Sequence, residues 1–191
     1  MIRYTLQVLF IVGTITAFSA EEKCNIKICD IKMEISQEYM LNITPKWESF
    51  INTGRCLISA ISVKFSTEGS AFESEAWKSI SDSEITSLFK YLCLKSRSSK
   101  ETKVHVCGLE NATEGVLAIY CLQQIVGKDW TEYNGDNEKL LSLVKQCDVP
   151  TAWPAALLQA ALKEVIASPQ CLDELLCFFY KNGVLYKKCS K

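Results

Sequence analysis

Apolar residues recur along most of this chain at the spacing of an α-helix. Positions i, i+3, i+4, i+7 and i+8 of one helical face are filled by Ile85, Leu88, Phe89, Leu92 and Cys93. This pattern predicts a helix with one buried face. Just before it, Ser81 and Glu84 have the spacing of a capping box, which marks a helix start.

Three later stretches predict further helices. Pro154 suits the first turn of a helix with apolar positions at Leu158, Ala161, Leu162, Val165 and Ile166. Residues 170–181 are expected to form a last helix that ends at Asn182-Gly183. Residues 113–126 are apolar on almost every side, so we expect their helix at the centre of the fold. Gly127 is a fitting stop for it.

The remaining helices are predicted from weaker signals. Thr44 and Pro45 suit the N-cap and first position of a helix that Gly54 weakens in its middle. Its apolar residues are Phe50, Leu57, Ile58 and Ile61. Residues 31–43 are expected to form another helix near the N-terminus, and residues 140–147 a shorter one.

Strand signals are few. Residues 103–107 alternate between polar and apolar, but the run is short and follows a polar stretch, so we read a loop or an isolated extended segment. Residues 66–74 and 128–136 are read as loops. The pattern as a whole predicts an all-α fold, a compact disulfide-stapled bundle of about five to seven helices.

The N-terminus has the order of a secretory signal peptide. Arg3 is followed by an uncharged, mostly apolar run over residues 4–15, then by small residues, then by an acidic pair. Cleavage after Ser19 or after Ala20 both fit, and we leave that choice open. The alternative, an uncleaved membrane anchor, is disfavoured because the apolar run is short for a span of about 20 residues.

Removal of residues 1–20 leaves residues 21–191 as a single secreted domain. The whole chain has 21 basic and 22 acidic residues, and loss of Arg3 makes the balance slightly more acidic. A nucleic-acid partner would need a basic stripe, which is missing. No second long apolar segment follows, so we expect no transmembrane segment after signal removal and an extracellular location.

Ten cysteines follow the signal, and an even count in an exported chain predicts five disulfides with no thiol to spare. They are Cys24, Cys29, Cys56, Cys93, Cys107, Cys121, Cys147, Cys171, Cys177 and Cys189. The connectivity stays open, except that Cys171 and Cys177 should not bond to each other. Six residues apart on one helix, their Cα atoms would be separated by about 9 Å along the axis, beyond the reach of a disulfide.

The sequence offers little for catalysis or metal binding. His105 is the only histidine, and no C-x-x-C pair is present, so no metal or cofactor is expected. His105 lies two residues from Cys107, but both fall in a predicted loop and the thiol is expected in a disulfide. A two-carboxylate glycosidase remains open in principle, with no acid in a clearly apolar setting beyond Asp173-Glu174. We therefore expect no enzymatic activity.

Two sequons and two tryptophans are candidate surface features. Asn111 and Asn42 are candidate glycan acceptors, and Asn111 is the better one because Pro45 directly follows the sequon of Asn42. Trp130 and Trp153 lie in loop-like stretches, and this makes them a candidate binding surface.

In style the chain resembles secreted, cysteine-rich helical proteins of invertebrate haemolymph, saliva or venom, although no motif carries residues over from them. The first functional hypothesis is a secreted, non-enzymatic extracellular binding protein that acts through a protein–protein surface. The alternative is an extracellular carrier of a lipid or small hydrophobic ligand in an internal helical cavity. Membrane attack is disfavoured because it needs a basic amphipathic helix.

Overall fold

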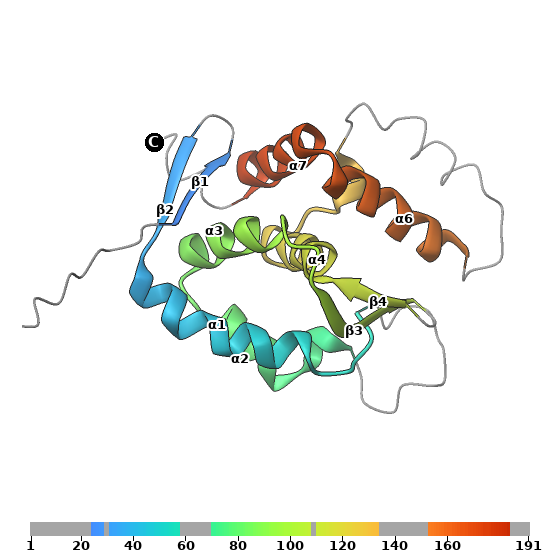
Figure 1. The fold of residues 1–191 in the computed structure, drawn as a ribbon, viewed down its shortest axis with the longest axis horizontal. Helices are drawn as coiled ribbons and strands as arrows, with labels where there is room; N and C mark the ends of the chain where they lie inside the picture. The colour runs from blue at the N-terminus through green and yellow to red at the C-terminus, as the bar shows by residue number, and fades with distance from the viewer. Residues whose placement is uncertain (1–23, 29–30, 58–69, 108–109, 134–152, 184–191) are drawn as a thin grey trace, which may run out of the picture.

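Most of the described chain is helical, and its helices lie in three layers. The computed structural model describes residues 24–28, 31–57, 70–107, 110–133 and 153–183. The six α-helices of these ranges are α1 (Gln37–Ile51), α2 (Glu75–Ser81), α3 (Ile85–Lys95), α4 (Glu114–Val126), α6 (Trp153–Ala167) and α7 (Pro169–Asn182). Figure 1 shows α1 and α2 on one side, α3 and α4 in the middle, and α6 and α7 on the other side.

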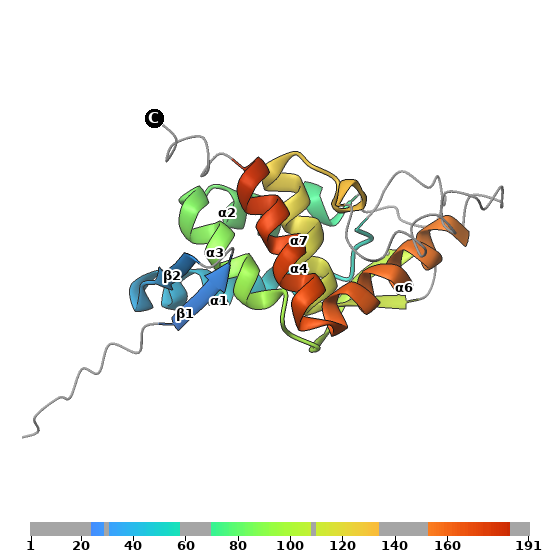
Figure 2. The same ribbon diagram turned by 90° about the horizontal axis from the view of Figure 1, so that it is seen from above.

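Helix α4 is the centre of the fold, as its apolar composition predicts. Every residue from Glu114 to Leu122 is buried, and α7 lies directly over α4 when the molecule is viewed from above (Figure 2). Gly127 ends the helix with a φ of +70°, a left-handed conformation that glycine adopts without steric cost. The predicted stop at Gly127 is therefore confirmed.

An aromatic cluster packs the layer of α1 and α2 against the middle layer. Trp47 and Phe50 of α1 have ring centroids 5.8 Å apart, and Phe50 lies 5.3 Å from Trp77 of α2. Trp47 also meets Tyr91 of α3 edge-on at 5.9 Å. Offset and edge-on ring pairs of this kind stabilise a core beyond their area burial.

Two antiparallel hairpins correct the all-α prediction. β1 (Cys24–Ile28) pairs with β2 (Ile31–Ile35), and β3 (Glu101–Cys107) pairs with β4 (Glu110–Thr113). Residues 31–35, expected in a helix, thus form a strand. Residues 103–107, expected as a loop or an isolated extended segment, are extended but belong to the paired strand β3. Figure 1 places the two hairpins at opposite ends of the middle layer.

Helix α1 begins earlier and ends earlier than the sequence predicts. Its N-cap is Ser36, whose hydroxyl accepts a hydrogen bond from the Tyr39 N–H. Pro45 lies inside the helix, and Thr44 donates to the Met40 carbonyl instead of capping. The helix ends at Ile51, so Leu57 lies beyond it, while Ile58 and Ile61 are outside the described residues.

Helices α3, α6 and α7 are found where the apolar spacing predicts them, with one change at a cap. Glu84 itself caps α3, because its carboxylate accepts hydrogen bonds from the N–H groups of Thr86 and Ser87 at 2.9 and 2.7 Å. Partial desolvation raises the pKa of Glu84, but these hydrogen bonds outweigh it and lower the pKa to about 2. Ser81 is the last residue of α2 and does not take part.

Two one-turn 3₁₀ helices lie in stretches predicted as loops, η1 (Ala71–Glu73) and η2 (Trp130–Glu132). The helix expected over residues 140–147 lies outside the described residues. None of the described helices is long and apolar enough to cross a membrane.

Candidate functional site

The most densely hydrogen-bonded ionisable side chain in the described interior is Glu114, the first residue of α4. Its side chain is 3% exposed. The Trp47 Nε1–H of α1 donates to Glu114 Oε1 at 2.5 Å, and the Lys95 ammonium of α3 lies 3.0 Å from the same oxygen. We call these residues, with Tyr91 and Ser98, the Glu114 cluster.

Hydrogen bonds keep Glu114 ionised despite its burial. Desolvation raises the pKa of this carboxyl, but hydrogen bonds from Ser98, Lys95 and Trp47 more than offset it, so the pKa is lowered from its ordinary value. The carboxylate also lies at a helix N-terminus, where negative charge is favoured. Within the same cluster, burial raises the pKa of Tyr91.

The backbone around Glu114 is as closely fitted as its side chain. The first N–H groups of α4 have no partners within the helix, and here Glu114 N–H donates to Lys100 O at 2.7 Å and Gly115 N–H to Ser98 O at 2.9 Å. A Cβ on Gly115 would lie 2.7 Å from the Ser96 carbonyl oxygen. The segment after α3 therefore caps α4, and only glycine fits at residue 115.

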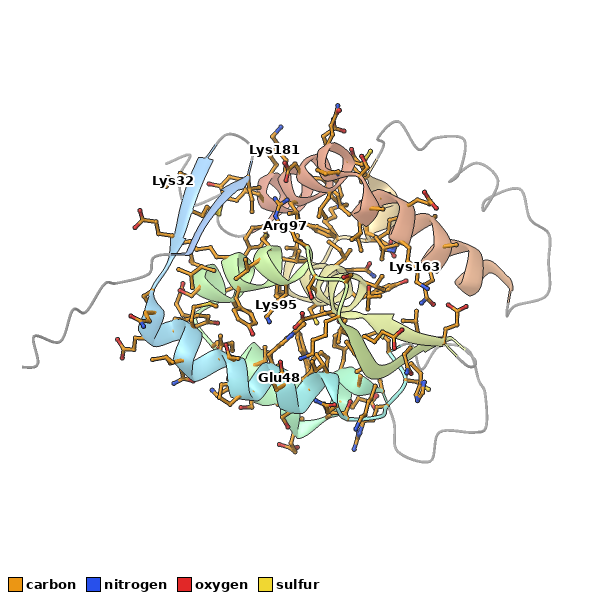
Figure 3. All side chains as sticks on the ribbon, viewed as in Figure 1. Lys32, Glu48, Lys95, Arg97, Lys163 and Lys181 are labelled. Carbon is orange, nitrogen blue, oxygen red and sulfur yellow. The ribbon has the colours of Figure 1, made fainter. Side chains whose placement is uncertain are left out.

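A second ion pair covers the cluster on its solvent side. Lys100 contacts both carboxylate oxygens of Glu48 of α1, at 2.7 and 2.9 Å. Figure 3 shows Glu48 and Lys95 in the region between α1 and α3. The two ion pairs link α1, α3, α4 and the segment after α3. The pKa of Glu114 is lowered and that of Tyr91 is raised, so both move away from the neutral range that suits a general acid or base.

His105 lies beside Cys56, not only near Cys107 in sequence. The His105 N–H donates to Arg55 O at 2.9 Å, and the His105 carbonyl accepts from Leu57 N–H at 2.7 Å. Cys56 and His105 thus form a parallel bridge, and Cys56 forms a second bridge with Ser70. Sequence analysis placed Cys56 in a helix and could not find this neighbour.

Four of the ten cysteines contradict the prediction of complete disulfide pairing. Cys56, Cys93, Cys121 and Cys171 carry free thiols. Cys93 and Cys121 are fully buried among apolar side chains, and burial raises the pKa of both thiols. They act as small core residues of α3 and α4, so packing and not disulfides joins these two helices.

The prediction that Cys171 and Cys177 are not bonded to each other is confirmed. Both lie in the continuous helix α7, where Cys171 is free and Cys177 is disulfide-bonded. The side chains of the other cysteines lie outside the described part of the chain: Cys24, Cys29, Cys107, Cys147 and Cys189.

The prediction that Trp130 belongs to an exposed binding surface is wrong. This residue opens η2, but its side chain is only 2% exposed and belongs to the main core. A short 3₁₀ turn capped by Asp129 folds the ring inward, a result that loop-like composition does not reveal. Trp153 begins α6, and its side chain lies outside the described residues.

Both sequon asparagines are exposed, in different settings. Asn42 lies on α1, three residues before the internal Pro45. Asn111 lies on β4 opposite His105, at the end of a two-stranded sheet. Thr113, the third residue of its sequon, caps α4 by accepting a hydrogen bond from Val116 N–H.

The sequence analysis missed an aromatic surface on α7. Phe178 is half-buried, and its ring centroid lies 6.2 Å from that of Tyr133, which follows η2. The Tyr133 hydroxyl donates to the carboxylate of Glu174, one helical turn before Phe178. We call Tyr133, Glu174 and Phe178 the α7 patch.

A hydrogen-bonding network fixes the charge of the α7 patch. The hydrogen bond from Tyr133 and a second one from Gln170 lower the pKa of Glu174. The carboxylate is therefore ionised at neutral pH, next to two aromatic rings that already have a fixed geometry. This combination suits a binding surface, since rigid aromatic residues are the usual anchors of protein interfaces.

Within the described ranges, no three His, Cys, Asp or Glu side chains are arranged to hold a metal ion. In comparisons with known proteins, no family model, no curated protein and no solved structure matches this chain.

Proposed function

We propose that this chain is a secreted, non-enzymatic extracellular protein that binds another protein through the α7 patch. The observation that carries the proposal is the half-exposed Tyr133–Phe178 pair, held in place by the hydrogen bond from Tyr133 to Glu174. Aromatic side chains with fixed rotamers lose little conformational entropy when a partner binds.

The chemistry of the α7 patch indicates what the partner presents. Glu174 keeps a negative charge beside two rings. An arginine or lysine of the partner can pair with the carboxylate while its side chain packs over an aromatic face. We therefore expect a basic side chain at the centre of the partner's surface.

The Glu114 cluster supports a non-catalytic function. It joins more charged and polar groups than any other part of the described interior, yet its carboxyl pKa is lowered and its phenol pKa is raised. Neither group exchanges a proton readily near neutral pH, whereas acid–base catalysis needs one that does. We infer that the Glu114 cluster has a structural role, joining helices α1, α3 and α4. Binding is then expected at the protein surface.

Native mass spectrometry of protein purified from its own source tests the proposal. A co-purified polypeptide is expected, and Phe178→Ala should weaken its binding by at least about tenfold, the loss typical of an interface anchor. Leu41→Ala is the matched control, because Leu41 is a 71% exposed apolar residue of α1, on the opposite layer of the fold.

Two results would count against the proposal. A bound lipid or small hydrophobic molecule in place of a polypeptide would favour the carrier alternative. Equal losses of binding in Phe178→Ala and Leu41→Ala would move the interface away from the α7 patch. Urea denaturation of both variants separates lost binding from lost folding.

A further inference from the structure

We infer, building on the proposed function, that the α7 patch binds an arginine of its protein partner in preference to a lysine. The guanidinium donates to both carboxylate oxygens of Glu174 and packs against the Phe178 ring. The basis is the way in which neighbouring side chains hold the Glu174 carboxylate and leave part of its accepting capacity unused.

Both carboxylate oxygens of Glu174 accept a hydrogen bond from a neutral donor. The Tyr133 hydroxyl, which follows η2, donates to Oε2. The side-chain amide of Gln170, one helical turn earlier on α7, donates to Oε1 at 3.2 Å. Because the two donors come from different elements and hold different oxygens, the exposed carboxylate has a fixed orientation before any partner arrives.

This arrangement leaves one accepting position on each oxygen of Glu174. An ionised carboxylate can accept about four hydrogen bonds, two at each oxygen, and the two neutral donors use one at each. A guanidinium carries two parallel N–H groups with the spacing of the two carboxylate oxygens, so it can fill both remaining positions at once. A lysine ammonium is a compact, strongly hydrated charge without this planar fork, so it gains less from a carboxylate fixed in this way.

The charge of Glu174 is also uncompensated in the described part of the chain, where no cation forms an ion pair with it. The preceding residue, Asp173, differs in this respect. Its carboxylate is paired with the guanidinium of Arg97, which follows α3, at 2.5 Å. Of these two adjacent carboxylates on α7, only Glu174 therefore offers an unpaired negative charge to an incoming arginine.

The Phe178 ring supplies a second contact for a planar cation. Phe178 lies four residues after Glu174 on the same face of α7, about 6 Å further along the helix axis. Its ring is held between Tyr133, at a centroid distance of 6.2 Å, and the fully buried Phe179, at 5.5 Å. A guanidinium bound to the carboxylate can stack on such a ring, and this stacking again favours arginine over lysine.

Selection of a phage-displayed random peptide library on the folded full-length protein tests the inference. We expect the enriched peptides to share an arginine. In a synthetic peptide of that sequence, replacing the arginine by lysine should weaken binding by at least about tenfold in fluorescence anisotropy, the loss expected for one charge-assisted hydrogen bond. Glu174→Gln should weaken binding of the arginine peptide similarly and remove the difference, because an amide offers only one oxygen. Glu164→Gln, which changes an exposed carboxylate of α6, is the matched control.

The possible results separate the arginine from the surface that binds it. Peptides that lose binding in Phe178→Ala but share no arginine, or that bind equally well with lysine, would overturn the arginine preference and leave the α7 patch as the binding surface. A selection that enriches no sequence would also overturn the preference. Peptides that bind Glu174→Gln and Phe178→Ala as tightly as the unaltered protein would contradict both the preference and the proposed surface. Urea denaturation shows whether each variant folds, and the comparison of arginine with lysine on the unaltered protein needs no variant.

Discussion

Trp47 and Glu114 are 67 residues apart in the sequence, and the indole N–H of one donates to the carboxylate of the other at 2.5 Å inside the core. The contact joins the middle of α1 to the first turn of α4. A buried carboxylate of this kind stabilises a fold only while its donors are present, because an unpaired buried charge is costly.

Replacing Trp47 by Phe should therefore destabilise the protein even though an aromatic ring is kept. The change removes one hydrogen bond to a charged acceptor, with an expected loss of about 2 kcal/mol in the free energy of unfolding. Urea denaturation measures it. In the Glu114→Gln background the same change should cost clearly less, and equal costs in both backgrounds would show that the hydrogen bond is not the cause.

The stability of the protein should fall in acid, with Glu114 as one source. Its pKa is lowered in the folded state from an ordinary value of 4.5, so below that pH the unfolded chain takes up the proton first. The contribution of Glu114 to the free energy of unfolding is fully present above about pH 5 and is lost as the pH falls.

Glu84 should extend the same loss to lower pH, since its folded-state pKa is about 2. Urea midpoints between pH 7 and pH 2 test both groups. Glu114→Gln and Glu84→Gln should each flatten the curve, and a slope unchanged by either variant would contradict the assignment.

The sequence predicted the helical core well because the relevant signals are local. Residues 113–126 are apolar all round, and Gly127 follows directly, so both the centrality of α4 and its end could be predicted. Helix α7 was predicted for the same reason. These signals depend on spacing within one element, and packing did not overrule them.

The errors arose where a local signal had two meanings. Pro45 suits the first turn of a helix, but Ser36 offers a cap earlier in the chain, so α1 starts there. Residues 31–35, Ile-Lys-Met-Glu-Ile, lie in the segment predicted as a helix, but they alternate with the period of a strand and pair with β1.

The site residues could not be predicted, because their partners are distant in sequence. Nothing near Glu114 indicates that Trp47 will donate to it. Tyr133 and Glu174 are 41 residues apart, and Cys56 meets His105 only through the path of the chain after α1. Periodicity reports which face of an element is buried but not which residues meet there.

Gly115→Ala should destabilise the protein, although the same change in most helices is stabilising. The added Cβ would lie 2.7 Å from Ser96 O and 2.9 Å from Ser98 O, both backbone atoms that cannot rotate away. We expect a loss of about 3 kcal/mol in the free energy of unfolding.

Gly54→Ala is the control for this substitution. Gly54 has a φ of +68°, but a Cβ added there would have no atom within 4 Å, so its cost comes from backbone strain alone, about 1 kcal/mol. Thermal and urea denaturation of both variants compare the two costs. If Gly115→Ala were as stable as Gly54→Ala, the segment after α3 could not lie as close to the start of α4 as described here.

A single glycan is expected, on Asn111, when the protein is made through a secretory pathway. Asn111 is exposed at the end of the β3–β4 hairpin, where an attached sugar meets solvent without disturbing the core. Asn42 is exposed as well, but its sequon lies inside helix α1 and is followed directly by Pro45, so the backbone around Asn42 is held in a helix. Asn111→Gln should abolish the mass shift caused by enzymatic deglycosylation, and Asn42→Gln should leave it unchanged. A shift that persists in Asn111→Gln and disappears in Asn42→Gln would reverse the assignment, and no shift in the unaltered protein would remove the support that glycosylation lends to secretion.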